Sequence, residues 1–166
     1  MNKSQIIQKL AKNGWASLTQ KEKDIYNSVD MREIIYEEAI KCLGKNMAPI
    51  NKSLGCVEAV NNIAIRAIGN SLGGGYSTYW LYNALTTSKR FKKIKEPLRG
   101  DIVISPSGFG NGKLSNGHVG ICGELDTIMS NDSAKLLWLK NYTIDSWKKR
   151  YFTKGGFPVD FFRVIS

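Results

Sequence analysis

The stretch "GHVGICGELDTIMSND", residues 117–132, decides the fold. It contains two short apolar runs, "HVGIC" (118–122) and "TIMSN" (127–131), separated by "GELD". Two such runs around a glycine-containing break predict two antiparallel strands joined by a turn. The first strand would begin with His118, the only histidine in the chain. The hairpin therefore carries the one imidazole that the protein has.

The residues before the hairpin show mainly helical patterns. Thr19 with Glu22 and Asp30 with Glu33 form two capping-box patterns within the first 45 residues. After a loop that contains Pro49, apolar residues at helical spacing return in "LGCVEAVNNIAIRAIG" (54–69), for which Ser53 is a candidate N-cap. A glycine-rich break then precedes a further predicted helix, "STYWLYNALTTSKRF".

The later residues read as strands. "GDIVIS" (100–105), "KLLWLKN" (135–141) and "FPVDFFRVI" (157–165) join the hairpin, with a short helix at "TIDSWKKRY". Helices followed by an antiparallel sheet predict an α+β fold. We expect a helical N-terminal extension over residues 1–45 and a separate α+β domain over residues 46–166.

The charge balance favours an anionic partner. Lys and Arg number 24 against 14 Asp and Glu, a net charge of +10, which suits nucleic acid, an anionic cell wall or a membrane surface. The basic residues are dispersed and form no nucleic-acid motif, so we expect no nucleic-acid partner. No apolar run approaches the roughly 20 residues that span a bilayer, and the N-terminus lacks the features of a signal peptide. We expect synthesis in the cytoplasm and no membrane span.

Cys56 is the best candidate nucleophile among the three cysteines. The odd number argues against a disulfide framework. A zinc site is disfavoured because His118 and Cys122 would lie about 13 Å apart along one strand. Cys56 falls in the first turn of a predicted helix, where the helix dipole and free N–H groups lower the pKa of a thiol. Cys42 lies near a helix C-terminus and Cys122 ends a strand, and neither position favours a thiolate.

A third polar residue on the partner strand would orient the ring of His118. A two-residue turn places Asn131 directly across from His118, and a three-residue turn places Asp132 there. We favour Asn131. The alternative for His118 itself is a histidine that only fills space beside a turn.

The ordered set "LGCVEAVNNI", "YSTYWLYNAL", "PLRGDIVISPSG", "NGHVGICGE" and "IMSNDS" resembles the CHAP (cysteine, histidine-dependent amidohydrolase/peptidase) family and its NlpC-type relatives. These are papain-like cysteine hydrolases of peptidoglycan peptides, many of them encoded by bacteriophages. The resemblance covers residues from about 50 to 165. It implies a papain-like fold with N-terminal helices packed on an antiparallel sheet.

The resemblance also implies the site residues. Cys56 would be the nucleophile and His118 the general base, with Asn131 or Asp132 as the orienting residue. The oxyanion would be held by the Cys56 backbone N–H and by a second donor, the side chain of Asn51 or Ser53. No metal or organic cofactor is needed for this chemistry.

The expected activity is cleavage of amide bonds in bacterial peptidoglycan, by an endopeptidase or an N-acetylmuramoyl-L-alanine amidase. The partners would be peptidoglycan and anionic wall polymers, and the protein would act as a monomer, after release from the cell or as a virion component. Trp138, Tyr142 and Trp147 either flank a substrate groove or fill the core. Two alternatives stay open: a basic nonenzymatic module that binds nucleic acid or protein, and a papain-like effector acting on another acyl substrate.

Overall fold

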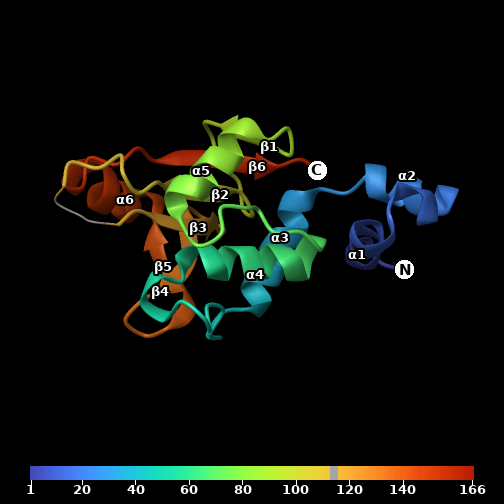
Figure 1. Ribbon diagram of the computed structural model, residues 1–166, viewed down its shortest axis with the longest axis horizontal. Helices are drawn as coiled ribbons and strands as arrows, with labels where there is room; N and C mark the ends of the chain where they lie inside the picture. The colour runs from blue at the N-terminus through green and yellow to red at the C-terminus, as the bar shows by residue number, and fades with distance from the viewer. Residues whose placement is uncertain (113–115) are drawn as a thin grey trace.

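The computed structural model describes residues 1–112 and 116–166 and has the expected α+β architecture (Figure 1). Residues 113–115, part of the glycine-rich loop before the hairpin, lie outside the described residues. The described strands form one six-stranded antiparallel sheet in the order β1-β6-β2-β3-β4-β5. Their bounds are β1 Phe91–Ile94, β2 Ile102–Ser105, β3 His118–Cys122, β4 Thr127–Asp132, β5 Leu137–Thr143 and β6 Asp160–Val164.

The predicted hairpin is confirmed as β3 and β4. Gly120 pairs with Ser130 and Cys122 with Ile128. Beyond them Gly123 donates its N–H to the carbonyl of Thr127, which closes a three-residue turn at 124–126. This register places Asp132, rather than Asn131, across from His118.

Seven described segments are α- or π-helical. Their bounds are α1 Lys3–Asn13, α2 Gln20–Asn27, α3 Met31–Lys41, α4 Cys56–Ile68, α5 Thr78–Thr87, α6 Ile144–Trp147 and the π-helix η3 Lys148–Lys154. The capping box of Thr19 and Glu22 is present at α2. At α3 Asp30 caps the helix, but Glu33 does not close a capping box because its carboxylate binds Arg99 instead. Within the described chain, no helix is both long and apolar enough to span a membrane.

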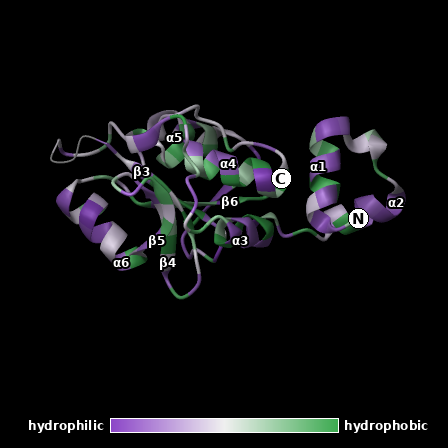
Figure 2. Cartoon of the chain, turned by 90° about the horizontal axis from the view of Figure 1, so that it is seen from below, coloured by the Kyte–Doolittle hydropathy of each residue, from purple (hydrophilic) through white to green (hydrophobic). Residues whose placement is uncertain are grey.

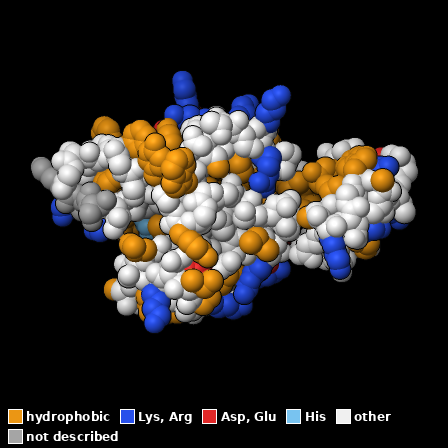
Figure 3. Space-filling view, viewed as in Figure 1, with side chains coloured by type: hydrophobic (Ala, Val, Ile, Leu, Met, Phe, Trp, Pro, Cys, Tyr) orange, Lys and Arg blue, Asp and Glu red, His pale blue; other side chains and the backbone are white. Residues whose placement is uncertain are grey.

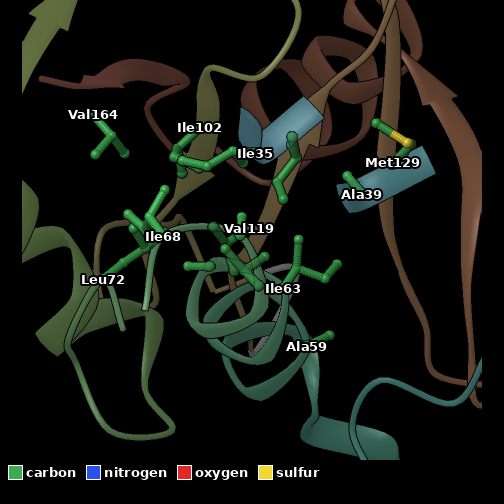
Figure 4. Close-up of a cluster of buried hydrophobic side chains, with 14 of the residues drawn as sticks. Ile35, Ala39, Ala59, Ile63, Ile68, Leu72, Ile102, Val119, Met129 and Val164 are labelled. Atoms are coloured by element: carbon green, nitrogen blue, oxygen red, sulfur yellow. The ribbon is translucent and has the colours of Figure 1, made fainter. Parts of the chain in front are cut away.

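The main core lies between one face of the sheet and helices α3, α4 and α5. Alternate strand residues point into it, including Ile102 and Val119, and they meet Ile35 of α3 and Ile63 of α4 (Figure 4). Trp138 of β5 is fully buried in the same core, and its indole N–H donates to the carbonyl of Ala39. The sheet therefore supports the helix that begins at Cys56.

The opposite face of the sheet carries a smaller cluster under α6 and η3. Val103 and Cys122 point to this side, where they pack with Trp147, Tyr151 and Phe157. Residues on alternate positions of β2 and β3 thus fill two different cores. The side chain of His118 points to the same face of the sheet as the smaller cluster, because His118 lies four positions before Cys122 on β3 and alternate residues of a strand share a face.

Helices α1 and α2 lie at one end of the molecule (Figures 1 and 2). Ser4 and Gln8 of α1 donate to the carbonyls of Ala67 and Arg66 at the end of α4. Helix α3, in contrast, contributes fully buried residues to the main core. The division at residue 45 stays a prediction, and the packing itself does not separate α3 from the sheet.

One predicted helix is shorter than its sequence pattern. Helix α5 ends at Thr87, and Phe91 begins the edge strand β1. Phe91 pairs with Val164 of β6 and is buried in the main core. Tertiary pairing therefore overrides the helical pattern at the end of this segment.

Candidate active site

Cys56 lies in the first turn of α4, as the sequence predicts, but the helix begins at Cys56 itself and is not capped by Ser53. Ser53 lies in a 3₁₀ turn, Lys52–Leu54, and the N-cap position is held by Gly55 without a side-chain hydrogen bond. Glu58 of α4 holds the preceding loop against the helix, because its carboxylate accepts hydrogen bonds from the backbone N–H groups of Ile50 and Asn51 at 3.0 and 2.8 Å. The start of α4 is thereby fixed in position.

Gly55 leaves room for a close approach beside Cys56. A Cβ atom added there would lie 2.2 Å from the Cβ of Ala48 and 3.4 Å from Nδ2 of Asn131. The first distance is far inside van der Waals contact, so only glycine fits. The same geometry places the amide of Asn131 next to the start of α4.

The thiol of Cys56 is protonated at neutral pH. Burial raises its pKa to about 11, while backbone hydrogen bonds from Val119, Val57 and Cys56 itself act in the opposite direction. The expectation of a lowered thiol pKa is therefore wrong. The removal of water from around the thiol raises its pKa by more than the N–H groups at the start of the helix lower it. Val119, whose backbone N–H favours the thiolate, is the residue that follows His118.

Cys42 and Cys122 are more deeply buried than Cys56, at 0% and 3% exposure. Burial, followed by the charge of Glu38, raises the pKa of Cys42. Burial, followed by the charge of Asp101, raises the pKa of Cys122. Neither thiol lines the pocket described below.

His118 begins β3 and its ring lies between aromatic neighbours. Ring centroids are 5.1 Å from Trp147 and 5.8 Å from Tyr151, with interplanar angles of 21° and 22°. Burial and the charge of Arg150 lower the pKa of His118 to about 4, and Asp132 partly opposes them. The imidazole is therefore neutral at neutral pH.

Ser130 is the hydrogen-bond partner of His118. Nε2 of the ring lies 3.0 Å from Oγ of Ser130, and that hydroxyl donates to Oδ1 of Asn141 at 2.7 Å. Because a hydroxyl has a single proton, Ser130 accepts from Nε2–H of the ring. The network therefore puts the ring proton on Nε2 and leaves Nδ1 as the basic nitrogen.

This contact corrects the expected arrangement around His118. Asn131 is 3% exposed and lies on the opposite face of β4, and its Oδ1 has no partner among the described residues. Asp132 lies across from His118, but its Oδ1 accepts the backbone N–H groups of Ala134 and Lys135 at 3.0 and 2.9 Å. The length of the turn explains this difference from the expected arrangement. With three residues in the turn, the side chain of Ser130, and not that of Asn131, lies on the same face of the sheet as His118.

Cys56 and His118 line the same pocket, which has a volume of about 510 Å³. The single histidine of the chain shows as a small pale-blue area at the surface in Figure 3. Ser53, Asn131, Asp132 and Asn141 also line this pocket, whereas Asn51 is not among its lining residues. Nδ2 of Asn51 is buried without a partner among the described residues.

Of the three aromatic residues considered for a groove, only Tyr142 lines the pocket. Trp138 and Trp147 are fully buried. Across the described residues, no three His, Cys, Asp or Glu side chains are grouped so that they could hold a metal ion.

The sequence analysis missed two residues that line the pocket, Asn141 and Arg150, and the buried Ser130 that contacts His118. The two-residue alternation of strands would have found Ser130 once the turn length was known. Asn141 is reached only through the pairing of β4 with β5, which contains an irregularity between Ile128 and Ser130. No local pattern marks it.

A scan of protein-family models and a search of curated proteins found no match to the chain.

Proposed function

We propose that this protein is a papain-like cysteine hydrolase that cleaves amide bonds in bacterial peptidoglycan peptides. The observation that carries the proposal is that Cys56 and His118 line one pocket. A thiol can act as the nucleophile of acyl transfer, and an imidazole in the same pocket can act as its general base. The sequence resemblance supplies the substrate class.

The first step uses the neutral pair. Nδ1 of His118 takes the thiol proton as the sulfur of Cys56 attacks the carbonyl carbon of the substrate. Burial penalises each charge on its own, but moving one proton creates both charges together, and their attraction offsets part of that cost. The Nε2–H bond to Ser130 holds the ring in the orientation that this transfer needs.

The oxyanion of the tetrahedral intermediate would lie at the start of α4. The first N–H groups of a helix have no acceptor within the helix, and Cys56 supplies one of them. The amide of Asn131, beside Gly55, is the second donor that we propose. This gives Asn131 a role in binding the oxyanion instead of orienting the histidine, and Asn51 and Ser53 stay predictions.

In the remaining steps, His118 passes on the proton that it took from Cys56. The imidazolium of His118 gives the proton to the leaving amine as the carbon–nitrogen bond breaks, which leaves a thioester on Cys56. Nδ1 then removes a proton from water, the oxygen attacks the thioester, and the thiol is restored when the acid product leaves.

The net charge of +10 supports a wall location for the activity. A cationic protein is attracted to anionic wall polymers, which raises its concentration near the substrate. We propose that the protein acts as a monomer on the wall, after release from the cell or as a virion component.

Digestion of purified peptidoglycans of several chemotypes, read by mass spectrometry of the released fragments, tests this function. The wild type and Cys42→Ala should release the same fragments, and Cys56→Ala should release none while keeping a cooperative unfolding transition. Equal activity of Cys56→Ala overturns the proposal. Absence of wall fragments, together with cleavage of other acyl substrates, would favour the papain-like effector.

A further inference from the structure

One wall of the pocket is formed by the π-helix η3, which contributes Arg150 and Tyr151. π-helical turns are rare and occur frequently at functional sites. Arg150 is the only Lys or Arg among the described lining residues, and Asp132 is their only carboxylate. The carboxylate oxygen Oδ1 of Asp132 is already held by backbone N–H groups.

Arg150 is grouped with two phenols. Its guanidinium carbon lies 5.6 Å from the ring centroid of Tyr151, and a side-chain hydrogen bond to Tyr151 contributes to a raised pKa of Arg150. The rings of Tyr151 and Tyr142 are 6.2 Å apart, and Tyr142 also lines the pocket. Side-chain hydrogen bonds link the hydroxyl group of Tyr151 to Tyr142 and to the guanidinium of Arg150, so these three polar groups lie together beside His118.

Arg150 forms none of the described salt bridges. Its side chain is exposed at the pocket, and its planar donor array matches the two oxygens of a carboxylate. A lysine would offer a point charge instead of this fork.

We propose that Arg150, with the hydroxyl groups of Tyr142 and Tyr151, binds a free carboxylate of the peptide substrate next to Cys56 and His118. The inference rests on the proposed function and adds a requirement on its substrate: the peptide carries a carboxylate close to the scissile amide. A pocket of about 510 Å³ has room for a peptide fragment rather than for a lone ion.

Carboxylate binding would also strengthen the base. The charged and titratable groups that face the ring are Arg150 and Tyr151 of η3, Asp132 of β4 and Tyr142 of β5, and Cys56 of α4 lines the same pocket. Arg150 disfavours the imidazolium, and a bound carboxylate neutralises Arg150. The pKa of His118 would then rise toward the value at which it removes the thiol proton more readily.

The test is an NMR titration of the full-length Cys56→Ser variant with acetyl-alanyl-alanine and with its C-terminal amide. We expect the acid to bind at least 5-fold more tightly than the amide and to raise the pKa of His118. Arg150→Gln should remove the preference and raise the pKa of His118 without ligand. Arg150→Lys should keep the low pKa and lose most of the preference.

Lys149→Gln is the matched control, since it removes the same charge from an exposed neighbour that does not line the pocket. It should keep the preference for the acid. Equal binding of acid and amide, binding of neither, or equal loss in Lys149→Gln and Arg150→Gln overturns the inference. A preference for the acid in a protein that hydrolyses no wall peptide would leave the carboxylate site standing and remove the proposed function alone.

Discussion

Nε2 of His118 lies 3.0 Å from Oγ of Ser130, and the two residues project from the same face of neighbouring strands. They are diagonal neighbours, because His118 lies across from Asp132 and Ser130 is two positions away. The bond selects which ring nitrogen carries the proton. The sequence analysis expected Asn131 or Asp132 to orient the ring, and we propose that Ser130 does so instead.

Ser130→Ala should lower the turnover of peptidoglycan peptides about 10-fold, the equivalent of one lost hydrogen bond of about 1.4 kcal/mol. The ring would lose the acceptor that keeps its proton on Nε2. ¹⁵N NMR of the imidazole should show the Nε2–H tautomer in the wild type and a mixture of tautomers in the variant.

Asn131→Ala distinguishes the proposed role of Asn131 from that of Ser130. It should lower turnover, because it removes the proposed oxyanion donor, but leave the tautomer of His118 unchanged. A tautomer that shifts in Asn131→Ala and not in Ser130→Ala would show that our assignment of the two residues is reversed.

Acid should destabilise the protein through His118. Its pKa is about 4 when folded and about 6.5 ordinarily, so the unfolded chain binds a proton first as the pH falls. The neutral ring therefore stabilises the folded state in full above about pH 6.5, and this stabilisation is lost as the pH falls from about 6.5 to about 4. Urea unfolding should show a decrease between pH 7 and 4.5 that is roughly 2 to 3 kcal/mol larger in the wild type than in His118→Gln. Equal decreases would mean that the folded ring titrates normally.

Gly55→Ala should destabilise the fold by about 1 to 3 kcal/mol, because its methyl group would overlap that of Ala48. Thermal unfolding measures the change. Turnover should also fall, since the start of α4 must move to relieve the overlap. Adding Ala48→Gly provides the space again, and the double variant should recover activity. A single variant as stable and active as the wild type would show that the loop yields without moving Cys56.

Local sequence patterns predicted much of the fold. The hairpin, the helix that holds Cys56 in its first turn and the capping box of Thr19 depend on neighbours in the chain, and each is present. The start of β1 was missed, because Phe91 joins the sheet through a partner more than seventy residues away, Val164. Such pairing leaves no trace in the local periodicity.

The site was predictable only in part. Cys56 and His118 were chosen as candidates from the residues themselves, and they do share a pocket. The partner of the ring was not found, because one additional residue in the turn reverses which side chains of β4 face it. The pKa of Cys56 also could not be read from its place in a helix, since it depends on how much protein covers the sulfur.

The last prediction concerns the ionisation of Cys56. Iodoacetamide should alkylate Cys56 before Cys42 and Cys122, because the other two thiols are more deeply buried. Its rate should rise with pH up to about 11, where the thiol ionises. His118→Gln should leave this profile nearly unchanged while turnover falls by a factor on the order of 10² or more. Mass spectrometry of each cysteine peptide across the pH range measures the profile. A rate already constant near neutral pH, and lost in His118→Gln, would instead demonstrate a resting thiolate–imidazolium pair and overturn the neutral pair from which the mechanism starts.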